Sequence, residues 1–224
     1  MTRLAFLLMA LLVASSTGLY ASGSSSQSAP APAAKPSLEE QAVLDYNKGL
    51  KHRDKAWEFE AKAAKADKEK DHDKNLKKAQ KEYGKVIEQQ LEAVKKNAKF
   101  HEAYSSLGYA YRKTGEYDKA LESYDKALTL QPNYVEAIEY RAEAYLRLNR
   151  LTEAQKALEV LIGKNPKYAV DLLGSMKQWL EANKDKELEG IGAEMVEAFG
   201  AWVADKEAFV EKQGIRLNEA EKAW

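Results

Sequence analysis

Residues 101–134 read HEAYSSLGYAYRKTGEYDKALESYDKALTLQPNY, and residues 135–168 follow the same pattern one unit later. Each unit is 34 residues long, and many positions one unit apart carry the same or a similar residue. The identical pairs include Ala103 and Ala137, Tyr111 and Tyr145, and Pro132 and Pro166. A period of this length predicts a solenoid, in which each unit buries its apolar face only by stacking on its neighbours.

Each unit contains two stretches with helical spacing. In the first copy the apolar positions of these stretches are Tyr104, Leu107, Gly108 and Tyr111, then Tyr117, Ala120, Leu121, Tyr124, Ala127 and Leu128. These positions recur at intervals of three and four residues, which is typical of one helix face. Gly108 leaves a notch in the first helix, and we expect Ala120 to lie opposite it. Gly115, and Asn149 in the second copy, stand where a helix commonly ends in a left-handed residue.

The order of residues over 104–132 resembles the tetratricopeptide repeat: an aromatic residue, Leu-Gly, Tyr, Ala, an aromatic residue, Ala and Pro. The second copy is looser, with Ile138 at the aromatic place, but Ala142 keeps the small place. The resemblance implies an all-α solenoid of helical hairpins, with repeats at 101–134 and 135–168. Because a solenoid needs at least about three units, the flanking segments must complete it.

The start of the chain has the layout of an export signal. Arg3 precedes an apolar run over residues 4–13, and small residues follow. This predicts a signal peptide at 1–21 and a protein of the periplasm or another exported compartment, with no membrane contact after cleavage. An uncleaved signal that anchors the protein in the membrane is the alternative. Residues 22–37 are rich in Ser, Ala and Pro and predict a flexible linker.

Residues 38–100 predict an elongated hairpin, a degenerate version of the repeat. Ser37 and Glu40 have the spacing of a capping box, and a long helix follows. We expect a turn at 71–75 and a return helix over 76–96, with helices roughly 30–45 Å long. Because residues 61–81 have little apolar content, we expect this tip to project into solvent.

Residues 169–224 depart from the repeat pattern and predict a pair of capping helices, as terminal repeats do when one face meets water. A break at 183–185 separates two amphipathic stretches. Their apolar positions are Leu172, Leu173, Met176, Trp179 and Leu180, then Ile191, Met195, Phe199, Trp202, Val203, Phe209 and Val210.

Composition disfavours several classes of function. The chain has 35 basic and 35 acidic residues, no cysteine and three histidines, and it lacks a phosphate-binding glycine loop and a metal-ligand motif. We therefore predict no enzyme activity, no cofactor, no metal and no nucleic-acid partner. Asp71, His72 and Asp73 fit a polar turn better than a metal site.

The charges are unevenly distributed along the chain: residues 45–99 carry 16 basic and 11 acidic residues, whereas 135–224 carry 13 and 17.

In tetratricopeptide repeat proteins the first helix of each repeat lines a concave groove. The resemblance therefore implies a partner-binding surface. Its expected residues are Glu102, Ser105, Tyr109, Arg112, Lys113, Glu136, Glu139, Glu143, Leu146 and Arg147. Tyr109, Arg112 and Lys113 would offer an aromatic platform and hydrogen-bond donors to a peptide.

The leading functional hypothesis is a non-catalytic adaptor that binds a partner peptide or helix in this groove. The alternative is a self-associating scaffold, in which Phe199, Trp202 and Phe209 pack against another copy of the chain.

Overall fold

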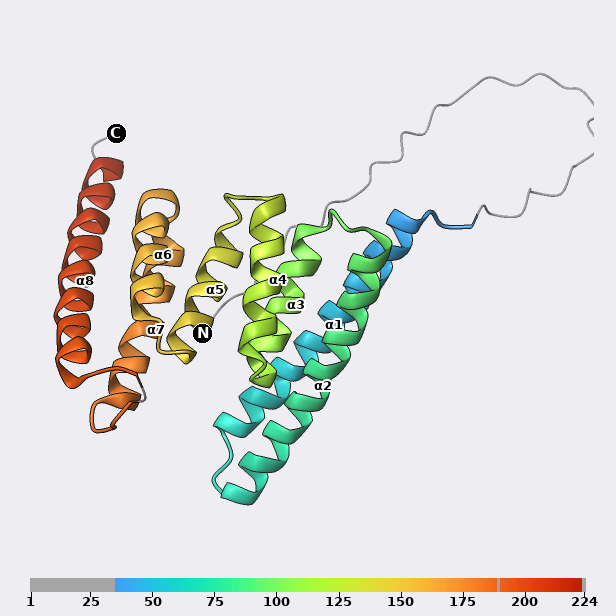
Figure 1. The fold of residues 1–224 in the computed structure, drawn as a ribbon, viewed down its shortest axis with the longest axis horizontal. Coiled ribbons are helices and arrows are strands. Elements are labelled where there is room, and N and C mark those ends of the chain that lie inside the picture. Colours follow the sequence, from blue (N-terminus) through green and yellow to red (C-terminus); the bar gives the residue numbers. More distant parts are fainter. Residues whose placement is uncertain (1–34, 189, 223–224) are drawn as a thin grey trace, which may run out of the picture. The chain divides into compact units, whose positions relative to one another are not determined.

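The computed structural model describes residues 35–188 and 190–222, with side chains up to residue 214. The described residues form eight helices and no strand, which confirms the predicted all-α class. The helices are α1 (Leu38–Ala64), α2 (Glu69–Lys96), α3 (His101–Thr114), α4 (Tyr117–Leu130), α5 (Val135–Arg147), α6 (Leu151–Lys164), α7 (Pro166–Asn183) and α8 (Ala193–Lys222) (Figure 1). The expected signal peptide and most of the expected linker lie outside the described residues.

The described residues from 36 onward form one compact unit, in which every helix packs on the next one along the chain. The odd-numbered helices also contact one another, α1 with α3, α3 with α5 and α5 with α7. No pair of even-numbered helices in the described part of the chain packs as closely. The odd-numbered helices therefore form one continuous layer, as expected for a solenoid of tetratricopeptide hairpins.

The first hairpin is long, as predicted, with 27 residues in α1 and 28 in α2. At 1.5 Å per residue each helix spans about 40 Å. Ser37 begins α1 with the expected capping box: its hydroxyl accepts a hydrogen bond from the Glu40 amide at 3.1 Å. The Glu40 carboxylate accepts one from the Ser37 amide at 2.7 Å.

The turn of this hairpin lies at residues 65–68, so the prediction of a turn at 71–75 is wrong. Those residues belong to the first turns of α2. The polar composition that suggested a turn has another cause: Glu69 and Asp71 place negative charge at the positive end of the helix dipole.

Two glycines permit close helix contacts. A Cβ atom at Gly49 of α1 would lie 2.3 Å from Nε2 of Gln90 in α2. A Cβ atom at Gly108 of α3 would lie 2.7 Å from Cε1 of Tyr124 in α4. The expected notch at Gly108 is therefore present, but Tyr124 fills it rather than Ala120.

The two residues expected to end a helix in the left-handed conformation do so. Gly115 has φ of 85° after α3, and Asn149 has φ of 57° after α5. Glycine adopts this conformation without steric cost, and asparagine tolerates it better than most residues.

The last two helices pack on the end of the solenoid. Phe199 of α8 is 2% exposed, and its ring meets the Trp179 ring of α7 edge to face at 5.7 Å. The structure starts α8 at Ala193, so Ile191 precedes the helix, contrary to prediction, and forms a single β-bridge with Leu188. No helix among the described residues is both long and apolar enough to span a bilayer.

Candidate binding face on the odd-numbered helices

Three aromatic side chains cross the layer of odd-numbered helices, one each from α1, α3 and α5. We call Trp57, Tyr109 and Tyr140 the aromatic row. The indole N–H of Trp57 donates a hydrogen bond to the Tyr109 hydroxyl at 2.7 Å, and the two rings are nearly perpendicular. The ring centroids of Tyr109 and Tyr140 are 5.1 Å apart. Trp57 is the most outward of the three, with 36% of its surface exposed, whereas Tyr109 and Tyr140 are half-buried.

Arg112 of α3 is held beside this row rather than extended into solvent. Its guanidinium carbon lies 5.2 Å from the Tyr109 ring centroid and 5.6 Å from that of Tyr140. Its Nη2 lies 2.7 Å from Oε2 of Glu143 in α5. Burial disfavours the charged guanidinium, but the Glu143 carboxylate together with the Tyr124 and Tyr109 side chains outweighs burial and raises the pKa of Arg112. Arg112 is therefore a fixed cation that joins α3 to α5.

Polar contacts also join α5 to α7. The second oxygen of Glu143 accepts a hydrogen bond from the Ser175 hydroxyl at 2.6 Å. Glu136 of α5 accepts one from the Tyr168 hydroxyl of α7, also at 2.6 Å. Burial, with the Glu136 carboxylate close by, raises the pKa of Tyr168, so this phenol stays protonated and donates. These bonds fix α5 against α7.

Other expected groove residues also have partners within the chain. Lys113 Nζ lies 2.6 Å from Oε1 of Glu60, which connects α3 to α1. Glu102 lies 3.1 Å from the neighbouring His101 ring. Arg147 is exposed at the end of α5 and forms no ion pair with another described residue.

Three of the expected groove residues are buried, so the expectation that their side chains face a partner is wrong. Ser105 is 3% exposed, Glu139 1% and Leu146 3%. Leu146 belongs to the large apolar cluster that continues into α7 and α8.

The binding residues expected from the sequence did not include Trp57, Tyr140, Glu60 or Ser175. Trp57 and Tyr140 had one available signal, since a large aromatic residue outside the apolar stripe of its helix often has a role at a surface. Glu60 and Ser175 had none, because only the stacking of helices shows which polar residues meet. Among the described residues, no group of three or more His, Cys, Asp or Glu side chains is placed to hold a metal ion.

Residues 101–134 match a family model described as tetratricopeptide repeat, and residues 123–156 match a second model with the same description. Together the matches cover residues 101–156, about a quarter of the chain. Repeats of this family generally mediate protein–protein interaction.

Proposed function

We propose that this chain, a tetratricopeptide repeat protein, is a non-catalytic adaptor that binds a partner peptide or helix across its odd-numbered helices. The observation that carries the proposal is the aromatic row, which presents Trp57, Tyr109 and Tyr140 from three successive odd-numbered helices. Aromatic side chains of this kind supply much of the binding energy at protein interfaces.

The ionic pairs beside the row indicate how a partner is recognised. Arg112 and Lys113 already pair with Glu143 and Glu60, so they do not offer free charge to a peptide carboxylate. The side chains are instead pre-organised, which lowers the entropy lost on binding. This favours a partner with apolar or aromatic anchor residues that pack on the row. Arg147, exposed at the end of α5 and without an ion pair to another described residue, supplies a further cation on the same helix as Tyr140.

The terminal helix leaves this side of the protein open. Within the described residues, α8 packs on α7 and has no comparable contact with α1, α3 or α5. An intramolecular plug over the aromatic row would have argued against the proposal.

The compartment is part of the proposal. The basic residue and apolar run in the first 21 residues support the periplasm or another exported space. Amino-terminal sequencing of the protein recovered from the exported fraction tests this. A new terminus near residue 22 supports it, whereas an intact Met1 in the cytosol contradicts it.

The function itself is tested by affinity capture with matched variants. Trp57→Ala removes one end of the aromatic row, and Phe209→Ala removes a similarly exposed aromatic ring, 44% exposed, from α8. We expect Trp57→Ala to release partners that the parent protein and Phe209→Ala retain, with unchanged helicity by circular dichroism. Equal retention by both variants would contradict binding at the row.

A self-associating scaffold is the second candidate, and a hollow between α7 and α8 favours it. The hollow has a volume of about 390 Å³, and its apolar lining includes Val170, Leu173 and Val210. Phe199 is buried against Trp179 and is not available to another copy. Sedimentation at increasing concentration tests this candidate, because a scaffold must form oligomers that Val170→Ser weakens.

A further inference from the structure

One face of α2 carries lysine at every position over more than four turns. At 3.6 residues per turn, positions 70, 74, 77, 78, 81 and 85 fall within one arc of about 100°. All six are lysine, and we call them the lysine face. The face is about 22 Å long at 1.5 Å per residue.

Most of this charge is not neutralised within the protein. Lys85 lies 2.6 Å from Glu82, and Lys78 Nζ lies 5.2 Å from the Phe59 ring centroid. Lys70, Lys74, Lys77 and Lys81 are exposed and form no ion pair with a described residue. The exposed ammonium groups of Lys70, Lys74 and Lys81 therefore lie along one helix face without an ion pair to a described residue, and like charges at this spacing repel one another.

The lysine face lies opposite the packed side of α2. Seven residues of α2 are buried, and five of them lie roughly 130–170° from the centre of the lysine arc: Ala79, Tyr83, Val86, Gln90 and Val94. The other two, Glu82 and Ala93, lie about 90–110° from it. Docking on the lysine face would therefore leave the contacts with α1 and α3 intact. It also uses none of the residues of the aromatic row.

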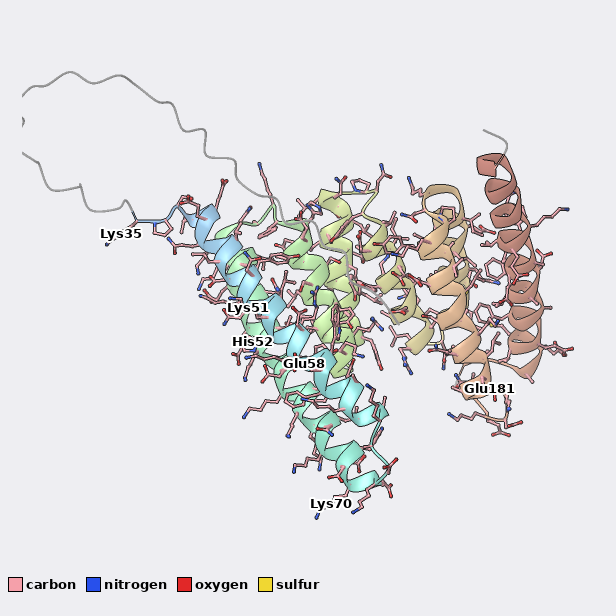
Figure 2. The ribbon with its side chains drawn as sticks, turned by 180° about the vertical axis from the view of Figure 1, so that it is seen from behind. Lys35, Lys51, His52, Glu58, Lys70 and Glu181 are labelled. Atoms are coloured by element: carbon pink, nitrogen blue, oxygen red, sulfur yellow. The ribbon has the colours of Figure 1, made fainter. Side chains whose placement is uncertain are left out.

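Four of the six lysines, at positions 70, 74, 77 and 78, lie on a part of the hairpin that extends past the solenoid. Gln80 donates a hydrogen bond to the Lys113 carbonyl at 2.9 Å, and Lys113 pairs with Glu60, so α3 ends at this level. Residues 61–79 continue beyond it, and Lys70 lies at the free end of the hairpin (Figure 2). Only alanines, Ala63 and Ala79, are buried there. Because this segment adds so little to the core, we infer that its role lies in the residues that it exposes.

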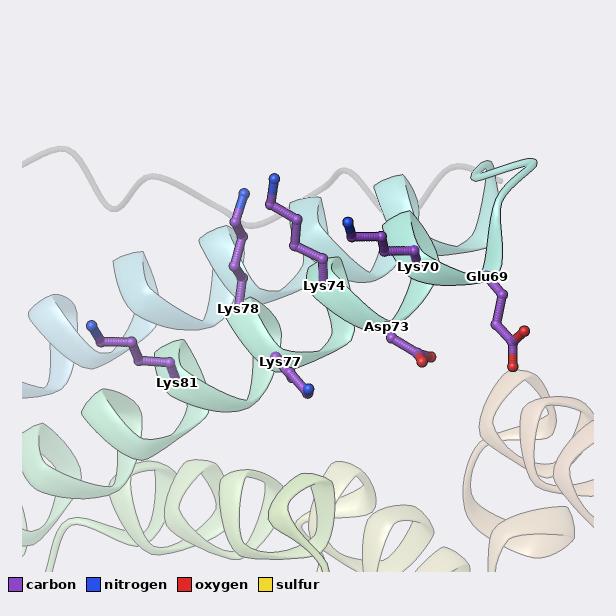
Figure 3. Close-up of a pocket in the computed structure, with 7 residues that line it drawn as sticks. All are labelled: Glu69, Lys70, Asp73, Lys74, Lys77, Lys78 and Lys81. Atoms are coloured by element: carbon purple, nitrogen blue, oxygen red, sulfur yellow. The ribbon is translucent and has the colours of Figure 1, made fainter.

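The side chains form a shallow hollow along the helix. It has a volume of about 720 Å³ and is lined by Glu69, Lys70, Asp73, Lys74, Lys77, Lys78 and Lys81. Figure 3 shows Lys70, Lys74 and Lys78 pointing to one side, whereas Glu69, Asp73 and Lys77 point to the other. Of these two carboxylates, that of Glu69 lies in the first turn of α2, where it interacts favourably with the helix dipole.

We propose that the lysine face docks the projecting hairpin onto an anionic lipid bilayer, which replaces the sequence-based expectation of no membrane contact after cleavage. Clusters of four to eight basic residues on a helix bind acidic lipid surfaces by charge density. Lysine suits this role because its ammonium group is a compact charge on a flexible stem, whereas bidentate recognition of a defined carboxylate or phosphate favours arginine. No arginine occurs in residues 54–111.

Other anionic partners fit the face less well. A protein helix would need apolar contacts beside the charges, but Leu76, 38% exposed, lies about 120° from Lys70 around the helix. A single-stranded nucleic acid would need aromatic rings on which bases stack, and the arc holds only lysine. Binding of a second copy of the chain to this face is the remaining alternative, and the test below distinguishes it.

The test uses residues 36–224, the compact unit that contains all eight helices, so that the apolar run over 4–13 does not contribute. Binding is measured by flotation with vesicles of phosphatidylcholine alone or with about one-third phosphatidylglycerol, at ionic strengths of about 0.05 and 0.5 M. The first variant combines Lys70→Glu, Lys74→Glu, Lys78→Glu and Lys81→Glu. A matched control makes the same charge change elsewhere: Lys126→Glu, Lys156→Glu, Lys167→Glu and Lys186→Glu.

We expect binding only to the anionic vesicles at low salt, weakened about 30-fold or more by the first variant and far less by the control. Circular dichroism checks that both variants stay helical. Retained binding by the first variant overturns the proposal, as does an equal loss in the control or equal binding to neutral vesicles. A first variant that loses only self-association, seen by sedimentation, overturns it in favour of a second copy. Vesicle binding needs no groove partner, so this result does not depend on the proposed adaptor function.

Discussion

Arg112 Nη2 and Glu143 Oε2 lie 2.7 Å apart, and this pair joins the first helices of the two repeats that the sequence makes clearest. Only 13% of the Arg112 side chain and 19% of the Glu143 side chain are exposed. The two residues were expected to face a binding partner, but they are mainly part of the scaffold that orients the aromatic row.

Removing one member of this pair leaves the other as an unpaired charge in a largely desolvated site. We therefore predict that Arg112→Ala lowers the free energy of unfolding by about 2–4 kcal/mol. The combined variant Arg112→Met with Glu143→Leu should recover much of this loss, because it removes both charges. Urea unfolding measures both effects. An unchanged midpoint for Arg112→Ala would contradict a structural role for the pair.

The helices were predictable because their signals are local. Tyr111, Gly115 and Pro132 mark a hairpin within one repeat, and the 34-residue period shows that hairpins stack. The composition of the binding face was less predictable. Whether Ser105 is covered, or Glu143 meets Arg112, depends on how closely neighbouring odd-numbered helices approach, and that distance is set by side chains far apart in the sequence.

The close approach at Gly108 gives a second prediction. In Gly108→Ala the new Cβ would meet the ring of Tyr124, which is fully buried, at 2.7 Å. The ring cannot move without disturbing α4, so we expect a loss of about 1–3 kcal/mol despite the higher helix propensity of alanine. Thermal unfolding measures this loss.

Gly84→Ala is the matched control, since Gly84 lies within α2 and an added Cβ would meet nothing within 4 Å. It should stabilise the protein by about 1 kcal/mol, the gain in helix propensity. If Gly108→Ala also stabilised the protein, the contact between α3 and α4 would be looser than the structure indicates.

Asp45 should control part of the acid stability of the first hairpin. The side chain is buried, and its carboxylate accepts hydrogen bonds from Lys48, at 2.7 Å, and from Lys96 of α2. Lys48 and Lys96 hold the pKa of Asp45 below its ordinary value of 3.8. A carboxyl group whose pKa is lower in the folded protein stabilises it above the unfolded pKa, and this contribution is lost as the pH falls through the folded value.

We therefore expect the contribution of Asp45 to be complete at pH 7 and to decline below about pH 4. Asp45→Asn should cost about 2 kcal/mol at pH 7 and progressively less as the solution is acidified, because the parent protein loses the same interaction. Thermal unfolding across this pH range measures the difference. The control is Asp54→Asn, whose carboxylate is largely exposed. A cost of Asp45→Asn that stays constant down to pH 2 would show that charge is not its cause.

The terminal position of α8 predicts how it responds to a cavity. Phe199 is 2% exposed and packs on Trp179, and α8 has extensive contact only with α7 among the described helices. Phe199→Ala should therefore cost about 3–5 kcal/mol of local stability. In a linear array each unit depends on its neighbours, so this loss should open α8 before the central repeats.

Hydrogen–deuterium exchange should show faster exchange in α8 and unchanged protection in α3 and α4. The control is Phe209→Ala, at an exposed position of the same helix, which should change the exchange rates of neither α8 nor the central helices α3 and α4. Uniformly faster exchange in Phe199→Ala would mean that the solenoid unfolds as one cooperative unit, and that α8 supports the binding face rather than only capping its end.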